Sequence, residues 1–445
     1  MKKLLLTVRK NYFDNTVEFS KLSKTFLLWA ISLALVYITN VYLTKVTGLE
    51  VYGKYTVFIS WVSLGSMILT FGWDGYLIQK LPQLLGSEKG KAGGRYLVEK
   101  ALLTFLLLYI LLGILLVAGT FYKKDLLGFL EADQLYLYLT LLLLFSLLAL
   151  IKAFLKIFHI VTQVQWFEDV LKPLLLFGVI IYYYYSKASL SLSELYLINC
   201  LVFGGLLLAL LVMTVRVYKK ELVSPEQRYV AEKWMKKCFY FMCIYLGYSI
   251  FSRMELLFLG YFGRNADAAK FQILLRISDI VLIPDFLFNY FLPQKFSYAF
   301  ANGQADESKA LFRNSSKTIL LLQLLCLAGV LSIGYFYLQS FGIASGEMYR
   351  LLAIMCTAPL FYSLFGSSNL VLKTSGNERY SFYALLVVLV LEAAANYIFI
   401  PGYGLPAAVY ISWLSILLYT FLLAVFLHKQ LGFTNSVTRH LFGGK

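Results

Sequence analysis

The chain has 445 residues, of which 60% are hydrophobic and only 14% are charged, and its formal net charge is +16. One soluble core could not bury that much apolar surface, so the composition excludes an ordinary soluble globular protein. The basic residues are dispersed over many short connections, which excludes the single basic stripe with stacking aromatics that is typical of nucleic-acid binding.

About twelve apolar stretches have the length needed to cross a bilayer core about 30 Å thick. Short polar segments connect them, and none of these segments is as large as a folded domain. We therefore expect an all-α polytopic membrane protein with spans at roughly 25–44, 55–73, 101–121, 135–151, 170–186, 195–215, 239–262, 277–293, 318–340, 349–371, 382–400 and 407–427.

The distribution of Lys and Arg predicts the orientation of these spans. If both termini are cytoplasmic, about 30 of the 40 basic residues lie on the inner side and about 8 on the outer side. The two largest inner groups are residues 2–24 and the sixth connection, residues 216–237. Aromatic runs such as residues 182–185 fall at predicted outer ends, where amphipathic rings prefer the headgroup level.

The sixth connection divides the spans into two sets of six. We expect an N-terminal lobe (residues 1–215), a basic cytoplasmic linker (216–237) and a C-terminal lobe (238–445). An even number of spans in each half predicts a parallel duplication of the two lobes.

Charged residues inside the spans are the main indication of function, because burying a charge in a bilayer is costly. Arg253 and Glu255 lie about 200° apart around a helix, so they are expected to face different neighbours. Glu392 and Asn396 are four residues apart and give span 11 a polar face. These groups either line a hydrated path or neutralise one another between helices.

Span 8 carries two acids. Arg276 and Asp279 are three residues apart, and Asp285 and Asn289 are four apart, so each pair can interact along one helix face. Pro284 lies between the acids and is expected to kink the span. For Arg276, extension of the side chain to the headgroups is the competing interpretation.

The N-terminal half offers fewer candidates. Asp74 marks the inner end of span 2 and could line a cavity. Lys172 is expected to extend toward the headgroups. The sequence contains neither a nucleophile, base and oxyanion set nor a GxxxxGK[ST] phosphate loop, so it predicts a protein that is not an enzyme and that uses no cofactor or metal.

Three passages resemble a known family, the oligosaccharide and O-antigen flippases of the polysaccharide-exporter branch of the multidrug/oligosaccharidyl-lipid/polysaccharide superfamily. The first, residues 50–55, is similar to the family's E-x-x-G-x-Y turn, and Gly53 would permit a tight turn there. The second is Arg253-Met254-Glu255 followed by Leu259-Gly260, with Glu in place of the family's Asp. The third is residues 396–404 with Ala407-Ala408, although Pro406 stands where Gly is more usual.

The resemblance implies two six-helix lobes around a central cavity that opens alternately to either side of a bacterial inner membrane. The implied substrate is a polyprenyl-pyrophosphate-linked oligosaccharide, such as the O-antigen repeat of lipopolysaccharide, moved from the cytoplasmic to the outer leaflet. A polysaccharide polymerase and glycosyltransferases are the implied partners.

The candidate residues then fall into three groups. The substrate-binding candidates are Arg253, Arg276 and Asn40; the two arginines are chosen because guanidinium groups pair well with phosphate oxygens. Ion coupling or cavity lining is assigned to acidic and amide side chains, since a desolvated carboxylate can exchange a proton or hold a cation: Glu255, Asp279, Asp285, Glu392, Asn396 and Asp74. The structural turns are Gly53, Pro401 and Gly404.

Two other functions remain open. A proton- or sodium-coupled drug or cation antiporter of the same superfamily is favoured by the excess of acids over bases within the spans. A membrane glycosyl polymerase or ligase is expected to need a substantial catalytic outer loop, which the sequence lacks.

Overall fold

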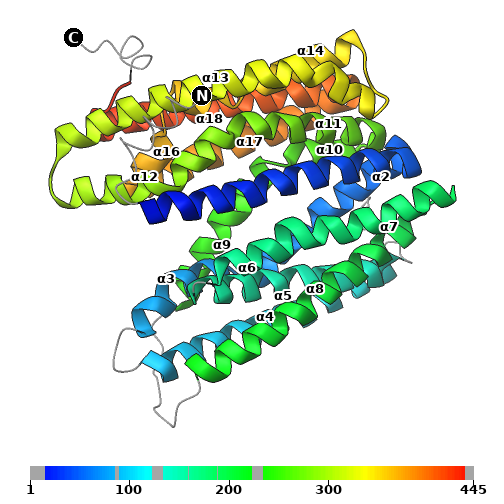
Figure 1. The fold of residues 1–445 in the computed structure, drawn as a ribbon, viewed down its shortest axis with the longest axis horizontal. Coiled ribbons are helices and arrows are strands. Elements are labelled where there is room, and N and C mark those ends of the chain that lie inside the picture. Colours follow the sequence, from blue (N-terminus) through cyan, green and yellow to red (C-terminus); the bar gives the residue numbers. More distant parts are fainter. Residues whose placement is uncertain are drawn as a thin grey trace. The chain divides into compact units, whose positions relative to one another are not determined.

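The computed structural model describes residues 16–85, 90–122, 134–158, 160–187, 189–222 and 234–435, which form helices and short connections and no β-strand (Figure 1). This confirms the expected all-α class, the one in which each segment satisfies its own backbone hydrogen bonds within a bilayer. The elements are α2 (Thr16–Thr70), α3 (Trp73–Leu85), α4 (Gly90–Tyr122), α5 (Leu135–Ile157), α6 (Val161–Gln165), the π-helix η2 (Trp166–Leu171), α7 (Lys172–Ser186), α8 (Leu192–Glu221), α9 (Trp234–Phe251), α10 (Met254–Tyr261), α11 (Asn265–Ser278), the 3-10 helix η3 (Asp279–Leu282), α12 (Ile283–Ala301), α13 (Ala305–Ser340), α14 (Gly346–Thr357), α15 (Leu360–Leu364), α16 (Ser368–Thr374), α17 (Glu378–Tyr403) and α18 (Leu405–Leu431).

Within the described residues, eight helices are long and apolar enough to cross a membrane, and α9 with α10 makes a ninth if this bent pair is one span. The difference from about twelve expected spans has three causes. Helix α2 carries the first two spans as one element that is interrupted only at Gly48. Span 5 is the 15-residue α7, which follows a π-helix, and span 8 is divided among α11, η3 and α12.

The chain forms two compact units. Unit 1 consists of Met1–Gly48 and Val62–Cys243, and unit 2 of Leu49–Trp61 and Ile244–Lys445. In unit 1, α5 packs against α3 and α8, while in unit 2 α17 packs against α18 and both contact α10. The expected linker lies partly outside the described residues, because residues 223–233 are not among them.

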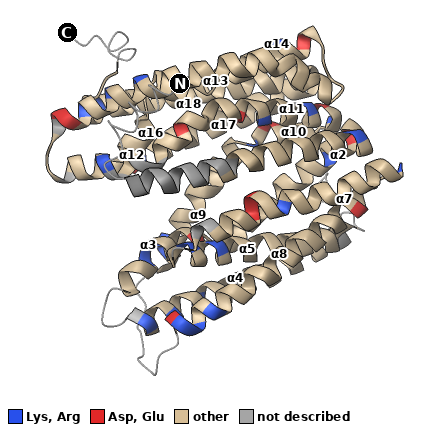
Figure 2. Ribbon diagram, in the orientation of Figure 1, with Lys and Arg blue, Asp and Glu red and all other residues tan. Residues whose placement is uncertain are grey.

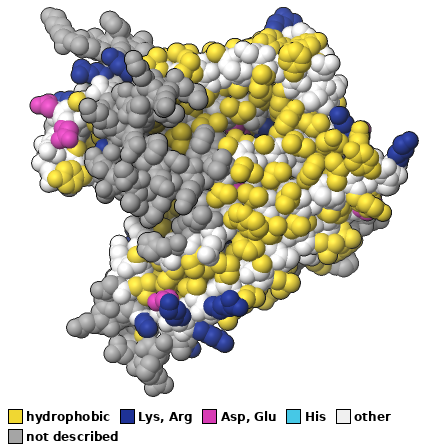
Figure 3. All heavy atoms as spheres, in the orientation of Figure 1, with side chains coloured by type: hydrophobic (Ala, Val, Ile, Leu, Met, Phe, Trp, Pro, Cys, Tyr) yellow, Lys and Arg dark blue, Asp and Glu magenta, His cyan; other side chains and the backbone are white. Residues whose placement is uncertain are grey.

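The helix surfaces match a lipid environment. Helix α4 exposes leucine and isoleucine side chains along its length, with Leu107 60% and Ile114 61% exposed. Figure 2 shows long uncharged stretches of helix, and Figure 3 shows hydrophobic side chains over much of the visible face of the described chain. A multi-pass membrane protein is the class that presents such surfaces.

Two expected turns have different outcomes. The prediction of a turn at Gly53 is wrong: this residue is helical, and the break in α2 is at Gly48, where φ is 77°. Gly53 instead permits close packing, since a Cβ there would overlap the backbone of Asn265. The turn at Gly404 is present, with φ 57° between α17 and α18, and Pro401 lies in the last turn of α17.

Candidate functional site

Arg253 lies at a break in the membrane-spanning region. Helices α9 and α10 meet there at an angle of 65°, and Ser252 and Arg253 belong to neither helix. The Ser252 hydroxyl bonds back to the Ser249 carbonyl at 3.1 Å, a local bond that competes with regular helix. The sequence had predicted one continuous span here, and the break gives Arg253 a position at the positive N-terminal end of α10.

Arg253 is half-buried, and its Nη1 donates a hydrogen bond to the Ser60 hydroxyl at 3.3 Å. Arg276 and Asp279 are close enough to act electrostatically on Arg253. The predicted pairing of Arg276 with Asp279 is present, with Nη1 3.9 Å from Oδ2, and the Arg276 side chain is 49% exposed. The two candidate guanidinium groups thus belong to one cluster in unit 2, in which Asp279 offsets part of their charge.

Glu255 and Glu392 form a buried carboxyl pair. Glu255 is 1% exposed in the first turn of α10, and Glu392 is 2% exposed in α17. The two carboxyl groups lie close enough to act on each other. Two neighbouring carboxyl groups can form a hydrogen bond only when one of them carries a proton, since ionised carboxylates only accept. Arg253 and Glu255 therefore have different partners, as their spacing predicts.

The carboxyl pair retains unused hydrogen-bonding capacity. Glu255 Oε1 and Glu392 Oε2 are buried with no hydrogen-bond partner among the described residues, and the same holds for both amide atoms of Asn396, which is fully buried one turn along α17. Four orphaned polar atoms on two neighbouring helices are costly unless a proton, water or cation joins them.

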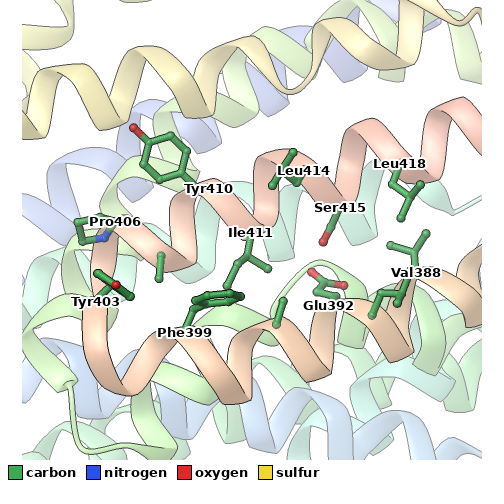
Figure 4. Close-up of a pocket in the computed structure, with 13 residues that line it drawn as sticks. Val388, Glu392, Phe399, Tyr403, Pro406, Tyr410, Ile411, Leu414, Ser415 and Leu418 are labelled. Carbon is green, nitrogen blue, oxygen red and sulfur yellow. The ribbon is translucent and has the colours of Figure 1, made fainter.

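A groove between α17 and α18 reaches this pair. It has a volume of about 450 Å³, and Figure 4 shows Glu392 and Ser415 pointing into it from opposite helices. The other lining side chains are aliphatic or aromatic, or belong to Pro406. Glu392 is therefore the one charged side chain among the residues that line this groove.

Asp285 lines a different cavity, which we call the α12–α16 pocket. This pocket has a volume of about 290 Å³ and is formed by residues from α12, α15, α16, α18 and the Gly366–Ser367 connection. The predicted interaction within α12 is present, with Asn289 Nδ2 donating to Asp285 Oδ2 at 2.7 Å. Asp285 is thus not part of the Glu255–Glu392 pair.

Unit 1 contains a charged cavity that sequence reasoning largely missed. Asp74 lines a cavity of about 260 Å³ together with Lys152, Glu168 and Lys172. Lys152 Nζ bonds Glu168 Oε1 at 2.6 Å, and Lys172 lies over the Phe203 ring at 5.4 Å. Lys172 therefore lines this cavity from the N-terminal end of α7.

A π-helix and the start of α3 position the two acids of this cavity, Glu168 and Asp74. Glu168 lies in the π-helix η2, whose extra residue per turn changes which side chains face the cavity. Asp74 lies in the first turn of α3, its Oδ1 is buried without a hydrogen-bond partner within the described chain, and burial raises its pKa above the ordinary value. The π-helix left no periodic signal in the sequence from which its position could be inferred.

Asn40, the remaining substrate candidate, is half-buried in the part of α2 that belongs to unit 1. Its carbonyl accepts a hydrogen bond from the Thr44 hydroxyl at 2.8 Å. Among the described residues there is no cluster of three or more side chains that could hold a metal ion through His, Cys, Asp and Glu alone.

No family model and no curated protein matches this chain. Solved structures do match it. A multidrug resistance MATE family transporter of the MOP superfamily, in an inward-facing conformation, is 11% identical over 92% of this chain and 98% of its own, with a TM-score of 0.67. The lipid II flippase MurJ, in an inward closed conformation, is 14% identical over 94% of this chain and 89% of its own, with a TM-score of 0.63.

A third match is the MATE multidrug transporter DinF-BH, 12% identical over 97% of this chain and 98% of its own, with a TM-score of 0.63. The protein therefore has the two-lobed helical fold of MOP superfamily transporters over nearly its whole length. At these identities the likeness establishes the fold, and the function has to be argued from the residues.

Proposed function

We propose that this protein is a flippase of the bacterial inner membrane that moves a polyprenyl-pyrophosphate-linked oligosaccharide from the cytoplasmic to the outer leaflet. Both termini are assigned to the cytoplasm, and residues 1–215 and 238–445 to the two lobes joined by a basic linker, apart from Leu49–Trp61, which belongs to unit 2. The observation that carries the proposal is the cluster of Arg253 and Arg276 at a helix break, beside a buried carboxyl pair in the same unit.

The arginine cluster suits a pyrophosphate. Each guanidinium group can donate two parallel hydrogen bonds to phosphate oxygens, and the α10 N-terminus adds positive potential. Arg253 is held by one hydrogen bond to the neutral Ser60 hydroxyl, so most of its donors are open to an anionic group. Asp279 offsets part of the charge, which would let the anion leave after translocation.

The Glu255–Glu392 pair suits coupling to a cation gradient. One shared proton, or a monovalent cation held by carboxylate and amide oxygens with Asn396, would satisfy the orphaned atoms. Arg253 is two residues from Glu255, so a change of charge at the pair acts directly on the α10 N-terminus. Coupling then follows from one short helix that carries both functions.

A second candidate is a proton- or sodium-coupled exporter of organic cations. It is favoured by four acids in the interior of unit 2, Glu255, Asp279, Asp285 and Glu392, against two arginines. The matched multidrug transporters have a similar fold, so the fold alone does not decide between the flippase and the exporter.

Leaflet-resolved transport in proteoliposomes separates the two. A fluorescent polyprenyl-pyrophosphate oligosaccharide and a cationic dye are followed in parallel under imposed proton and sodium gradients. The flippase proposal requires movement of the lipid-linked sugar, and dye export without sugar movement would replace it with the antiporter.

A further inference from the structure

The α12–α16 pocket differs from the α17–α18 groove of the same unit in the number of polar side chains that line it. Most of its lining can form hydrogen bonds, whereas the α17–α18 groove is almost wholly apolar. The polar lining residues are Asp285, Asn289, Tyr362, Ser367, Ser368, Asn369, Lys373 and Thr420. The pocket's volume of about 290 Å³ is just below the roughly 300–1,000 Å³ typical of sites for drug-sized ligands.

Several polar groups of the pocket have their orientation fixed by neighbours. Tyr248 donates to Asn369 Oδ1 at 3.2 Å and shares a second hydrogen bond, of 2.9 Å, with the Tyr419 hydroxyl. Because Asn369 Oδ1 faces Tyr248, the Asn369 Nδ2 group points away from Tyr248 and can donate a hydrogen bond elsewhere. On α12, the bond from Asn289 to Asp285 uses one carboxylate oxygen and leaves the other as an acceptor. A set of pre-oriented groups binds a ligand at less entropic cost.

The pocket also contains groups whose hydrogen-bonding capacity is unused within the described chain. Ser367 is 8% exposed, and its hydroxyl is buried with no partner. Lys373, an exposed residue at the edge of the pocket, has its Nζ 4.7 Å from the centre of the Tyr248 ring. A buried hydroxyl without a partner in a polar cavity indicates that something else binds there.

The charges in the pocket limit what that ligand can be. A simple anion is attracted by Lys373 and repelled by Asp285, and a simple cation the reverse, so neither gains from both charges of the lining. A neutral hydroxyl group both donates and accepts, and it can therefore satisfy Asp285 on one side and Asn369 or Lys373 on the other. The Tyr362 ring in the lining can cover an apolar face of a ring-shaped ligand.

We propose that the α12–α16 pocket binds a neutral polyhydroxylated group, one sugar unit of the transported glycan. This assignment rests on the proposed flippase function. The pocket has room for a single sugar ring and not for an oligosaccharide, so it recognises one position of the chain. It lies near the end of unit 2 that the Lys and Arg distribution places in the cytoplasm, where the substrate is collected.

The test is saturation-transfer NMR on the purified full chain with a panel of neutral methyl glycosides as probes. Inorganic pyrophosphate and tetraphenylphosphonium serve as the anionic and cationic comparisons. The variants are Asp285→Asn and Asn369→Ala, with Ser332→Ala as the matched control, because the Ser332 hydroxyl bonds only the Ala328 carbonyl of its own helix. Thermal unfolding in detergent confirms that each variant is folded.

We expect at least one glycoside to give a transfer signal that falls about tenfold in both pocket variants and is unchanged in Ser332→Ala. Absence of a signal from every glycoside, or a signal that the pocket variants leave unchanged, would overturn the pocket assignment. Sugar binding does not require transport, so a glycoside signal without flipping in proteoliposomes would overturn the proposed function and retain the pocket.

Discussion

The two charged interiors of this protein are organised in opposite ways. In unit 1, Lys152 and Glu168 form a tight ion pair beside Asp74 and Lys172, and the cavity has equal numbers of acids and bases. In unit 2, Glu255 and Glu392 face each other with orphaned oxygens. Oppositely charged groups in a membrane interior stabilise each other, whereas two neighbouring carboxyl groups keep capacity for a proton or a cation. We therefore expect charge substitutions in unit 2 to alter transport and those in unit 1 to alter stability.

The largest effect is expected for Arg253→Ala. Loss of charge-assisted hydrogen bonds to a phosphate group costs about 1.5–3 kcal/mol, so flipping should fall by about 10- to 100-fold. The flipping rate of Arg253→Lys should lie between those of the wild type and Arg253→Ala, because lysine keeps the charge and loses the paired donors. The control is Arg313→Ala on α13, an exposed arginine. Equal flipping by Arg253→Ala and the control would remove Arg253 from the substrate site.

Glu392→Gln should abolish coupling to the cation gradient while downhill movement of the substrate continues. Glutamine keeps a hydrogen bond to Glu255 but cannot release a proton or supply a carboxylate to a cation. Gradient-driven accumulation should fall at least about fivefold, the lower end of usual coupling energies, while downhill movement continues. Tyr410→Phe, which changes an exposed side chain of the same groove, is the control. A gradient response equal to that of the wild type would show that the pair is structural, like the ion pair of unit 1.

Gly404→Ala tests the turn that connects α17 to α18 near the unit 2 site. The residue has φ 57°, and a Cβ there would lie 2.6 Å from Arg264 Nη1 and from Asp267 Oδ2. We expect a loss of about 1–3 kcal/mol in the free energy of unfolding. Gly402→Ala is the matched control, since a Cβ at Gly402 meets nothing within 4 Å. Equal melting temperatures for the two variants would contradict the strain at Gly404.

The smallest effect is expected for Asp74→Asn in unit 1. Burial raises the pKa of this carboxyl group, so its ionised form opposes folding at neutral pH. The neutral amide should stabilise the fold by under about 1 kcal/mol at pH 7. This advantage should disappear as the pH falls below the unfolded pKa of about 4, where both states are protonated. Flipping should be unchanged, and a large loss of flipping would mean that unit 1 also carries function.

Apolar length and charge distribution predict much of the fold, because the lipid solvent leaves few alternatives to helices. The breaks were harder to predict. Pro284 indicated the interruption of span 8, and the structure has the 3-10 helix η3 directly before it. No proline marks the break at Arg253, where serine side chains and packing interrupt the helix.

The site residues were identified individually and their grouping was not. Spacing along a helix predicts pairs such as Asp285 with Asn289, which lie on one face. Glu255 and Glu392 come from helices far apart in sequence, and Lys152 meets Glu168 through a π-helix. Such pairings depend on tertiary packing that a single sequence does not encode in any local pattern.

Residues Leu49–Trp61 belong to unit 2 although they are synthesised among the helices of unit 1. Val57 in this segment packs at Gly260, where a methyl group would overlap it, and Ser60 accepts the hydrogen bond of Arg253. These partners leave the ribosome about 200 residues later, which corresponds to roughly 10–40 s at usual rates of elongation. During that interval Leu49–Trp61 lacks the contacts that Arg253 and Gly260 later provide. Residues Leu49–Trp61 therefore complete their packing only after α10 has been synthesised, although they enter the membrane with the first helices of the chain.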